Sequence, residues 1–229
     1  MATRTRRAER RQEPLSRERI VAAAVELLDT VGESGLTFRV LAERLATGPG
    51  AIYWHVAGKA ELLGAATEAV VEAAVTPGDG HAGTPQDEIR ALALGLFDAI
   101  DTHPWVGTQL AMATGQGPVL QVFERIGRRI RALGVPEAAW FTAASALMNY
   151  ILGVAGQNAA NTRAAPPGVT DRAAFLDAVA SEWSSLDADA YSFTRSVAGQ
   201  LREHDDRAEF LAGIDLVLAG ITAGLRTGP

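Results

Sequence analysis

Apolar residues recur at helical spacing through most of the chain, and the strict alternation that is typical of strands is nearly absent. Glycine, proline and small polar residues separate the apolar stripes, as expected of segments where helices start and end. This pattern predicts an all-α fold. Short helices lie near the N-terminus, and a larger helical part follows them.

Residues 1–60 are predicted to contain an arm and three helices. Residues 1–14 are polar and charged and carry no apolar stripe, so we expect a mobile arginine-rich arm. Ser16 is placed to cap a helix over about 17–31. A second helix is expected over 37–45 and a third from Pro49 to about residue 55, with a tight turn between them. The first helix carries an apolar stripe of Ile20, Ala24, Leu27, Leu28 and Val31.

The remaining chain is predicted to form longer helices. The first covers about 59–75, and the glycine-rich residues 76–84 are the strongest candidate linker. Asp206 with Glu209 three residues later resembles a capping box. After the linker, the expected helices cover residues 85–102, 104–114, 118–133, 136–161, 171–184, 189–204 and 206–226.

Charge is distributed unevenly along the chain, whose net charge is −6. Residues 1–60 carry ten basic and seven acidic side chains, whereas the remainder carries eleven basic and twenty acidic ones. A basic segment attached to an acidic body indicates a nucleic-acid contact surface. An ordinary soluble surface with an arginine-rich tail explains the same counts equally well.

The composition argues against several classes of protein. The chain has no cysteine, which excludes disulfides, thiolate catalysis and cysteine-based zinc sites. Its four histidines lack metal-ligand spacing, and no glycine-rich phosphate loop or GxSxG elbow occurs. We therefore expect no enzyme, cofactor or metal. No stretch resembles a membrane span and no apolar signal peptide precedes the body, so the expected location is cytoplasmic.

Three apolar-striped helices with a tight second turn indicate a helix-turn-helix, in which the short third helix enters the DNA major groove. The segment LTFRVLAERLATGPGAIYWHVAGKAELL, residues 36–63, closely resembles the DNA-binding segment of the TetR (tetracycline-repressor) family. The shared marks are a threonine before the second helix, Leu-Ala-x-x-Leu within it, the Tyr53-Trp54-His55 run, and Gly58-Lys59. The resemblance implies a one-component transcriptional repressor. It also implies that this repressor binds palindromic double-stranded operator DNA as a homodimer and that a small effector releases it from the DNA. The apolar character of the helical body predicts that this effector is largely apolar.

On this resemblance, residues 15–60 form a helix-turn-helix DNA-binding domain, and residues 61–229 form a helical effector-binding and dimerisation domain. The alternative interpretation is a helical DNA-binding or protein-interaction module without a small-molecule effector. A salt-dependent mobility shift with promoter DNA would separate a DNA-binding protein from a module that binds only proteins.

The resemblance also guides the assignment of DNA contacts. Arg39 is positioned to reach a guanine edge, although an exposed helical arginine is commonly only solvated. The tip of the third helix offers no side-chain donor, so readout there uses apolar contact or close backbone approach. This tip consists of Pro49, Gly50 and Ala51. The expected phosphate contacts are Thr37, Tyr53, His55 and Lys59.

Three further expectations concern packing beneath this surface. Ile52 and Val56 are spaced i, i+4 and should form the buried face of the third helix. Trp54 is expected to pack in the core, at least in part. Thr37 is expected to cap the second helix in addition to contacting phosphate.

The segment 136–161 is apolar nearly all round and is therefore expected to be the central helix of the body. One row of polar side chains along this helix would then bury amide groups. Buried amides need hydrogen-bond partners, either across a dimer or from a ligand in a pocket. This row consists of Ser145, Asn149, Gln157 and Asn161. The expected ligand-binding residues are Trp105, Gln109, Met112, Ser145, Asn149 and Gln157.

A dimer interface formed by the 136–161 and 206–226 helices of both chains is what the resemblance implies. Several glycines in the last helix are consistent with close approach of a neighbouring helix, although an alanine- and glycine-rich sequence can also simply tolerate them. The expected interface residues are Phe210, Ile214, Val217, Leu218, Ile221 and Leu225.

Overall fold

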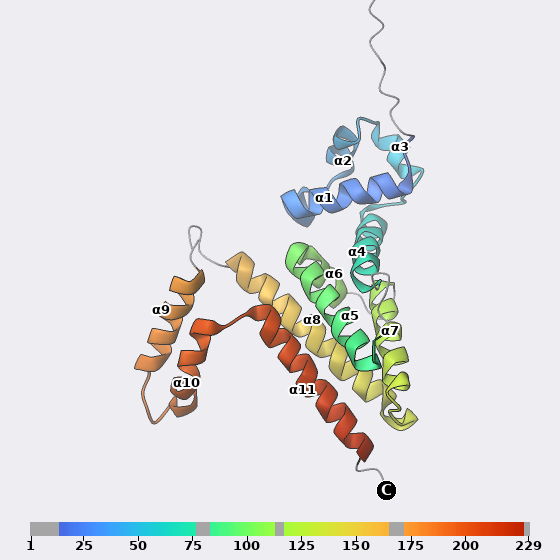
Figure 1. The fold of residues 1–229 in the computed structure, drawn as a ribbon. Coiled ribbons are helices and arrows are strands. Elements are labelled where there is room, and N and C mark those ends of the chain that lie inside the picture. Colours follow the sequence, from blue (N-terminus) through green and yellow to red (C-terminus); the bar gives the residue numbers. More distant parts are fainter. Residues whose placement is uncertain (1–13, 77–82, 113–116, 165–171, 227–229) are drawn as a thin grey trace, which may run out of the picture. The chain divides into compact units, whose positions relative to one another are not determined.

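The computed structural model describes residues 14–76, 83–112, 117–164 and 172–226, without the side chains of 162–164 and 224–226. Every regular element within these ranges is helical, which confirms the predicted all-α fold (Figure 1). The chain divides into two compact units, Met1–Ala66 and Thr67–Pro229. Nearly all of the expected arm and most of the expected linker lie outside the described residues.

The N-terminal unit contains α1 (Arg17–Gly35), α2 (Phe38–Arg44), α3 (Pro49–Tyr53) and the first turns of α4 (Lys59–Val75). Ser16 caps α1 as predicted, because its Oγ accepts a hydrogen bond from the backbone N–H of Arg19 at 3.3 Å. The predicted apolar stripe of α1 is buried except for Val31. Val31 is exposed where the left-handed backbone of Gly32, with φ of 68°, interrupts the helix.

The C-terminal unit begins within α4 and continues with helices most of whose bounds follow the predicted ones. These are α5 (Pro85–Thr102), α6 (Pro104–Met112), α7 (Pro118–Ala132), the short 3-10 helix η1 (Glu137–Ala139), α8 (Trp140–Ala164), α9 (Arg172–Ser185), α10 (Ser192–Val197), the 3-10 helix η2 (Ala198–Glu203) and α11 (Asp206–Arg226).

Helix α8 is central to this unit, as predicted, and packs against α5, α6, α7 and α11 (Figure 1). By length and composition the span Glu137–Asn161 would pass as a membrane span, so the expectation that no stretch resembles one is wrong. Its packing against four helices is instead that of a core helix. Only 33% of the most apolar stretch is buried within the chain, which leaves part of an apolar helix uncovered.

Two expectations for the last third of the chain are wrong. The single helix predicted over 189–204 is divided into α10 and η2, which pack on each other and on α9. The cap of α11 is Asp205 rather than Asp206, because Asp205 Oδ1 accepts from the backbone N–H of Ala208 at 2.7 Å. Asp206 instead forms an ion pair with Arg172 (2.6 Å) and a hydrogen bond with His204 Nε2 (3.0 Å).

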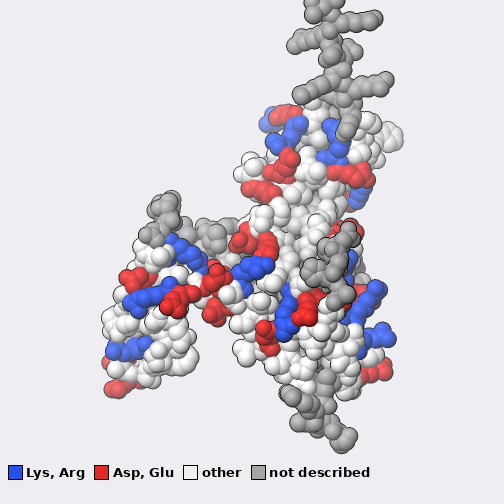
Figure 2. Space-filling view, viewed as in Figure 1, with Lys and Arg blue, Asp and Glu red and all other residues white. Residues whose placement is uncertain are grey.

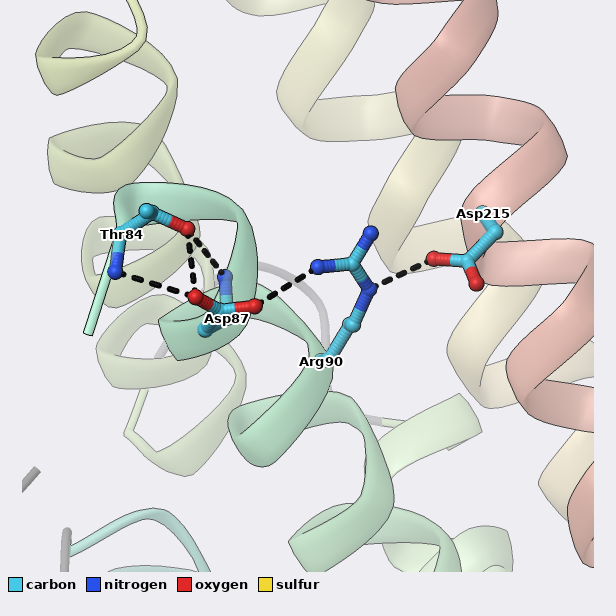
Figure 3. A network of polar contacts seen from close by, with 4 residues as sticks. All are labelled: Thr84, Asp87, Arg90 and Asp215. Carbon is cyan, nitrogen blue, oxygen red and sulfur yellow. Dashed lines mark hydrogen bonds and ion pairs between the residues drawn. The ribbon is translucent and has the colours of Figure 1, made fainter.

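Helices α5 and α11 are joined by arginine–aspartate pairs at two levels. At the start of α5, Thr84 and Asp87 form a capping box, and Asp87 accepts from Arg90 Nη1 at 2.8 Å (Figure 3). Arg90 Nε in turn donates to Asp215 of α11 at 2.6 Å. Further along, Arg207 of α11 binds Asp98 of α5 through two hydrogen bonds of 2.9 and 3.1 Å. The two pairs show that α5 and α11 run antiparallel.

Two glycines allow close helix approach within the C-terminal unit. A β-carbon at Gly95 of α5 would overlap the backbone carbonyl oxygen of Ala74 in α4. A β-carbon at Gly213 of α11 would overlap the hydroxyl of Tyr150, which reaches across from α8 to donate to the carbonyl of Phe210 at 3.2 Å. Gly213 therefore serves packing inside the chain.

Candidate nucleic-acid interface

The turn between α2 and α3 is closed by two backbone hydrogen bonds. The N–H of Thr47 donates to the carbonyl of Ala42 at 3.0 Å, and the N–H of Ala46 donates to that of Glu43 at 3.2 Å. This is the Schellman arrangement, in which the residue after the helix cap has a left-handed backbone and is usually glycine. Ala46 holds this position with φ of 51°. The turn therefore fixes the direction of α3 through a strained alanine.

Helix α3 begins at Pro49, whose missing N–H costs nothing at the first helical position. Ile52 and Val56 are buried beneath it, as their spacing predicts. Pro49 and Gly50 are exposed, and Ala51 is half-buried. The tip of α3 thus presents backbone and small apolar groups to the solvent, as the sequence indicates.

The aromatic residues at the end of α3, Tyr53 and Trp54, are both exposed. Tyr53 stacks on Phe38 of α2 with ring centres 4.5 Å apart and nearly parallel planes, and it stays largely exposed. Trp54 is 89% exposed, so the expectation that it packs in the core is wrong. Ile52 and Val56 occupy the buried row, and a residue two positions after Ile52 lies on the opposite side of the helix.

Arg17 joins the start of α1 to the segment after α3. Its Nη1 donates to the carbonyl of His55 at 2.8 Å and pairs with Glu61 Oε1 at 2.7 Å. The other oxygen of Glu61 accepts from the backbone N–H of Ala57 at 2.7 Å. This backbone bond and the Arg17 guanidinium lower the pKa of Glu61, so the carboxylate stays charged. A glutamate in the first turn of α4 is the one sequence signal that could have indicated these contacts between the start of α1 and the start of α4.

The basic side chains of the N-terminal unit differ in how firmly they are held. Lys59 Nζ donates to the backbone carbonyl of Glu33 at 2.6 Å, and Arg44 pairs with Glu26. The side chain of Arg39 is 83% exposed, with the carboxylate of Glu43 3.9 Å away. Figure 2 shows basic and acidic side chains interspersed on the visible face of this unit.

The remaining predicted contact residues lie at the edges of this surface. Thr37 caps α2 as predicted, because its Oγ1 accepts from the N–H of Val40 at 3.2 Å, and the residue is exposed. His55 is half-buried. The predicted DNA-binding residues thus come from the start of α2, from both ends of α3, from the segment after it and from the start of α4, within one compact unit.

The predicted effector residues do not gather around one cavity among the described parts of the chain. Trp105 is buried and Met112 is exposed, both on α6. Asn149, Gln157 and Asn161 are exposed in the single chain, so their own chain does not bury these amides. Gln157 and Asn161 line a groove between α8 and the start of α11. Gln109 and Ser145 are half-buried.

The predicted interface residues divide in a similar way. Phe210, Ile214 and Leu218 are buried against the other helices of their own chain and are not available to a partner as they stand. Val217 and Ile221 are half-buried. The side chain of Leu225 lies outside the described residues. The exposed side of α11 instead carries Leu216, which is 76% exposed.

This geometry defines a helix-turn-helix protein with a second, larger helical unit. Residues 20–66 match the description "Bacterial regulatory proteins, tetR family", and residues 76–225 match "Tetracyclin repressor-like, C-terminal domain". The second match alone covers more than half of the chain. The chain belongs to the TetR family, as the resemblance of residues 36–63 predicts.

Solved and curated relatives agree with this assignment. A solved structure described as the transcriptional regulator SCO7222, a TetR from Streptomyces coelicolor, is 66% identical, with a TM-score of 0.83 over 92% of this chain and 99% of that one. An HTH-type transcriptional regulator of Saccharopolyspora erythraea is 33% identical over 61% of this chain and 59% of its own length. The HTH-type transcriptional repressor DrrR1 of Streptomyces coeruleorubidus is 30% identical over 66% and 56%. The chain thus spans little more than half the length of these two curated relatives.

Proposed function

We propose that the chain is a cytoplasmic transcriptional repressor that binds a near-palindromic operator as a homodimer. The observation that carries this proposal is the exposed surface formed by α2, α3 and the residue after α3. Arg39, the tip of α3 and Trp54 are all solvent-exposed on a unit whose turn and loop are fixed by hydrogen bonds. A tryptophan with this much exposed surface is unusual on a free surface and suits an interface.

Each exposed group has a separate role in the proposal. Arg39 reads a guanine edge in the major groove, because its side chain is exposed and only loosely paired. Tyr53 is presented to a phosphate by its stacking on Phe38, which restricts the ring. Trp54 covers the sugar-phosphate backbone next to it. Lys59 exchanges the carbonyl of Glu33 for a phosphate when DNA binds, since the strong phosphate field attracts an ammonium group.

The dimer is proposed to form through the sides of α8 and α11 that their own chain leaves uncovered. On α8 this side carries Ala146, Asn149 and Gly153, and on α11 it carries Leu216 and Gly220. Both glycines have open space around them, so a partner helix can approach closely. The exposed Asn149 would then find its hydrogen-bond partner across the interface.

The effector is proposed to be a small, largely apolar molecule bound in the C-terminal unit, with residues 15–60 serving DNA binding and 61–229 serving the effector and the dimer. Membership of the TetR family supports this division of labour. Binding of the effector favours a dimer geometry in which the two α3 helices, one from each chain, no longer fit successive major grooves of the DNA. Coupling of this kind is typically about 1–3 kcal/mol.

Selection from a random-sequence DNA library tests the proposal without knowledge of the regulated genes. Rounds of binding to the full-length chain should enrich a near-palindromic sequence whose half-sites are about one helical turn apart. The Arg39→Ala variant should enrich a sequence that is degenerate at one or two positions of each half-site. Enrichment of no sequence, or of one without internal symmetry, would contradict a dimeric sequence-specific repressor.

A further inference from the structure

A groove of about 380 Å³ lies between the second half of α8 and the start of α11. Its floor carries the ring of Tyr150 of α8, behind which Phe210 and Phe97 are buried. Phe210 stacks on Phe97 of α5 with ring centres 4.7 Å apart, and Tyr150 of α8 lies 5.7 Å from Phe210 on another side. Tyr150 is held there by its hydrogen bond to the carbonyl of Phe210 and by the missing side chain of Gly213. The accessible aromatic part of the floor is therefore one fixed ring, that of Tyr150.

The rim of this groove is polar and acidic. Helix α8 contributes the amides of Gln157 and Asn161, and α11 contributes the carboxylates of Asp206 and Glu209. Asp206 is neutralised by Arg172, 2.6 Å away. Glu209 forms no ion pair with any side chain in the described part of the chain.

The charge of Glu209 acts inside the groove. Burial and, after it, the negative charge of Glu209 raise the pKa of Tyr150. A carboxylate that acts on the ring of Tyr150 repels anions, whereas an ammonium group gains from both the carboxylate and the electron-rich ring. The volume suits a molecule of one or two rings.

We propose that this groove is a binding site for a small aromatic ammonium compound. The flat ring of the ligand lies against Tyr150, its ammonium group pairs with Glu209, and the amides of Gln157 and Asn161 bind its polar atoms. The site shares only Gln157 with the residues expected to bind the apolar effector. It is therefore a second site of a different chemical class.

Calorimetric titration of the full chain with three indole compounds tests the charge preference. Tryptamine carries an ammonium group, 3-ethylindole is neutral and indole-3-propionate is an anion. We expect tryptamine to bind with a stoichiometry of one per chain and about fivefold more tightly than 3-ethylindole, the effect of one partly exposed carboxylate. Indole-3-propionate should bind more weakly than either. Equal affinity for all three compounds, or no binding of tryptamine, would overturn the proposal.

Two variants place the site and one serves as a control. Glu209→Gln should lower the affinity for tryptamine about fivefold and leave that for 3-ethylindole unchanged. Gln157→Trp, at an exposed rim position, should fill the groove and abolish binding of both compounds. Glu137→Gln removes an exposed carboxylate far along the chain from the groove residues and should change neither affinity. If Glu209→Gln behaves like Glu137→Gln, Glu209 is not the cation partner and the proposal fails. Because no DNA is present, the outcome is independent of the proposed repressor function.

Discussion

Ala46 and Gly134 occupy the same structural position in two different helix ends. Gly134 follows α7 with φ of 79°, and the N–H groups of Gly134 and Val135 donate to the carbonyls of Arg131 and Ile130, as in the turn after α2. Neither the exposed Ala46 nor Gly134 has a side-chain clash that would complicate exchange. The two positions therefore isolate the cost of a left-handed backbone.

We expect Ala46→Gly to raise the free energy of unfolding by about 0.5–1 kcal/mol, because relief of the left-handed strain exceeds the added chain entropy of glycine. Gly134→Ala should lower it by a similar amount for the same reason. Urea unfolding followed by circular dichroism measures both. A loss of stability in Ala46→Gly would show that the turn is not strained as described.

Gly95 should be far less tolerant than Gly134, because its missing side chain faces a backbone. A β-carbon there meets the carbonyl of Ala74, which cannot move without shifting α4. We expect Gly95→Ala to destabilise the chain by about 1–3 kcal/mol through overpacking. Gly127→Ala, on α7 with open space around it, is the matched control and should be neutral or slightly stabilising. Similar thermal midpoints for the two variants would contradict the close approach of α4 and α5.

At the scale of elements, α5 and α11 pack antiparallel and are joined by two ion pairs. One pair has its arginine on α5, and the other has its arginine on α11. Arg90 of α5 meets Asp215, whereas Asp98 of α5 meets Arg207. Reversal of one helix would place like charges opposite each other. These partly exposed pairs therefore contribute more to the choice of helix direction than to total stability.

Charge exchange tests this pairing. Asp98→Arg and Arg207→Asp should each destabilise the chain, and the double variant should recover, with a coupling free energy of about 0.2–1 kcal/mol. Equilibrium unfolding of the four proteins measures this energy. Glu124→Arg, which breaks a pair within α7 only, should show no coupling to Arg207→Asp. Strict additivity of Asp98→Arg and Arg207→Asp would mean that the pair does not couple the helices.

Most helix bounds could be predicted from the sequence, because caps and apolar periodicity are local signals. The ranges 59–75, 85–102 and 206–226 agree with α4, α5 and α11 at both ends. The 189–204 segment could not be resolved into α10 and η2, since α- and 3-10 turns have similar short-range patterns. The sequence also does not show which face of a helix is covered by the rest of the chain. Helix α8 is apolar on nearly all sides, so its sequence does not indicate which side packs against the chain. The exposure of Asn149 is therefore seen only in the structure.

The candidate DNA surface shows the same limit at single residues. The family resemblance predicts which segment contacts DNA, and Ile52 and Val56 could be assigned to the core by their spacing. The role of Arg17 could not, because its partners His55 and Glu61 are distant in sequence. Hydrophobicity alone predicts burial of Trp54, but its position opposite the buried Ile52 leaves it exposed to solvent.

At the scale of the whole molecule, the first test concerns the proposed dimer and the helix faces that form it. Leu216→Arg places a charge on the uncovered side of α11 and should convert the dimer to monomers, because a buried unpaired charge is costly. Leu120→Arg, at an exposed apolar position of α7, is the matched control and should leave the dimer intact. Sedimentation equilibrium measures both. A monomeric unmutated chain would contradict the dimer, and a dimeric Leu216→Arg variant would contradict the assigned interface.

The most direct test of the central claim is the salt dependence of operator binding, measured by fluorescence anisotropy with the selected palindrome. Lys59→Ala should weaken binding to all sequences about equally and reduce the slope of log affinity against log salt by about one. Arg39→Ala should instead lose about 1–3 kcal/mol of discrimination at one or two base pairs per half-site. Arg128→Ala, an exposed position on α7, should change neither quantity. If Lys59→Ala and Arg39→Ala both bind the operator with the affinity and slope of the unmutated chain, the helix-turn-helix surface described above is not the DNA-binding surface.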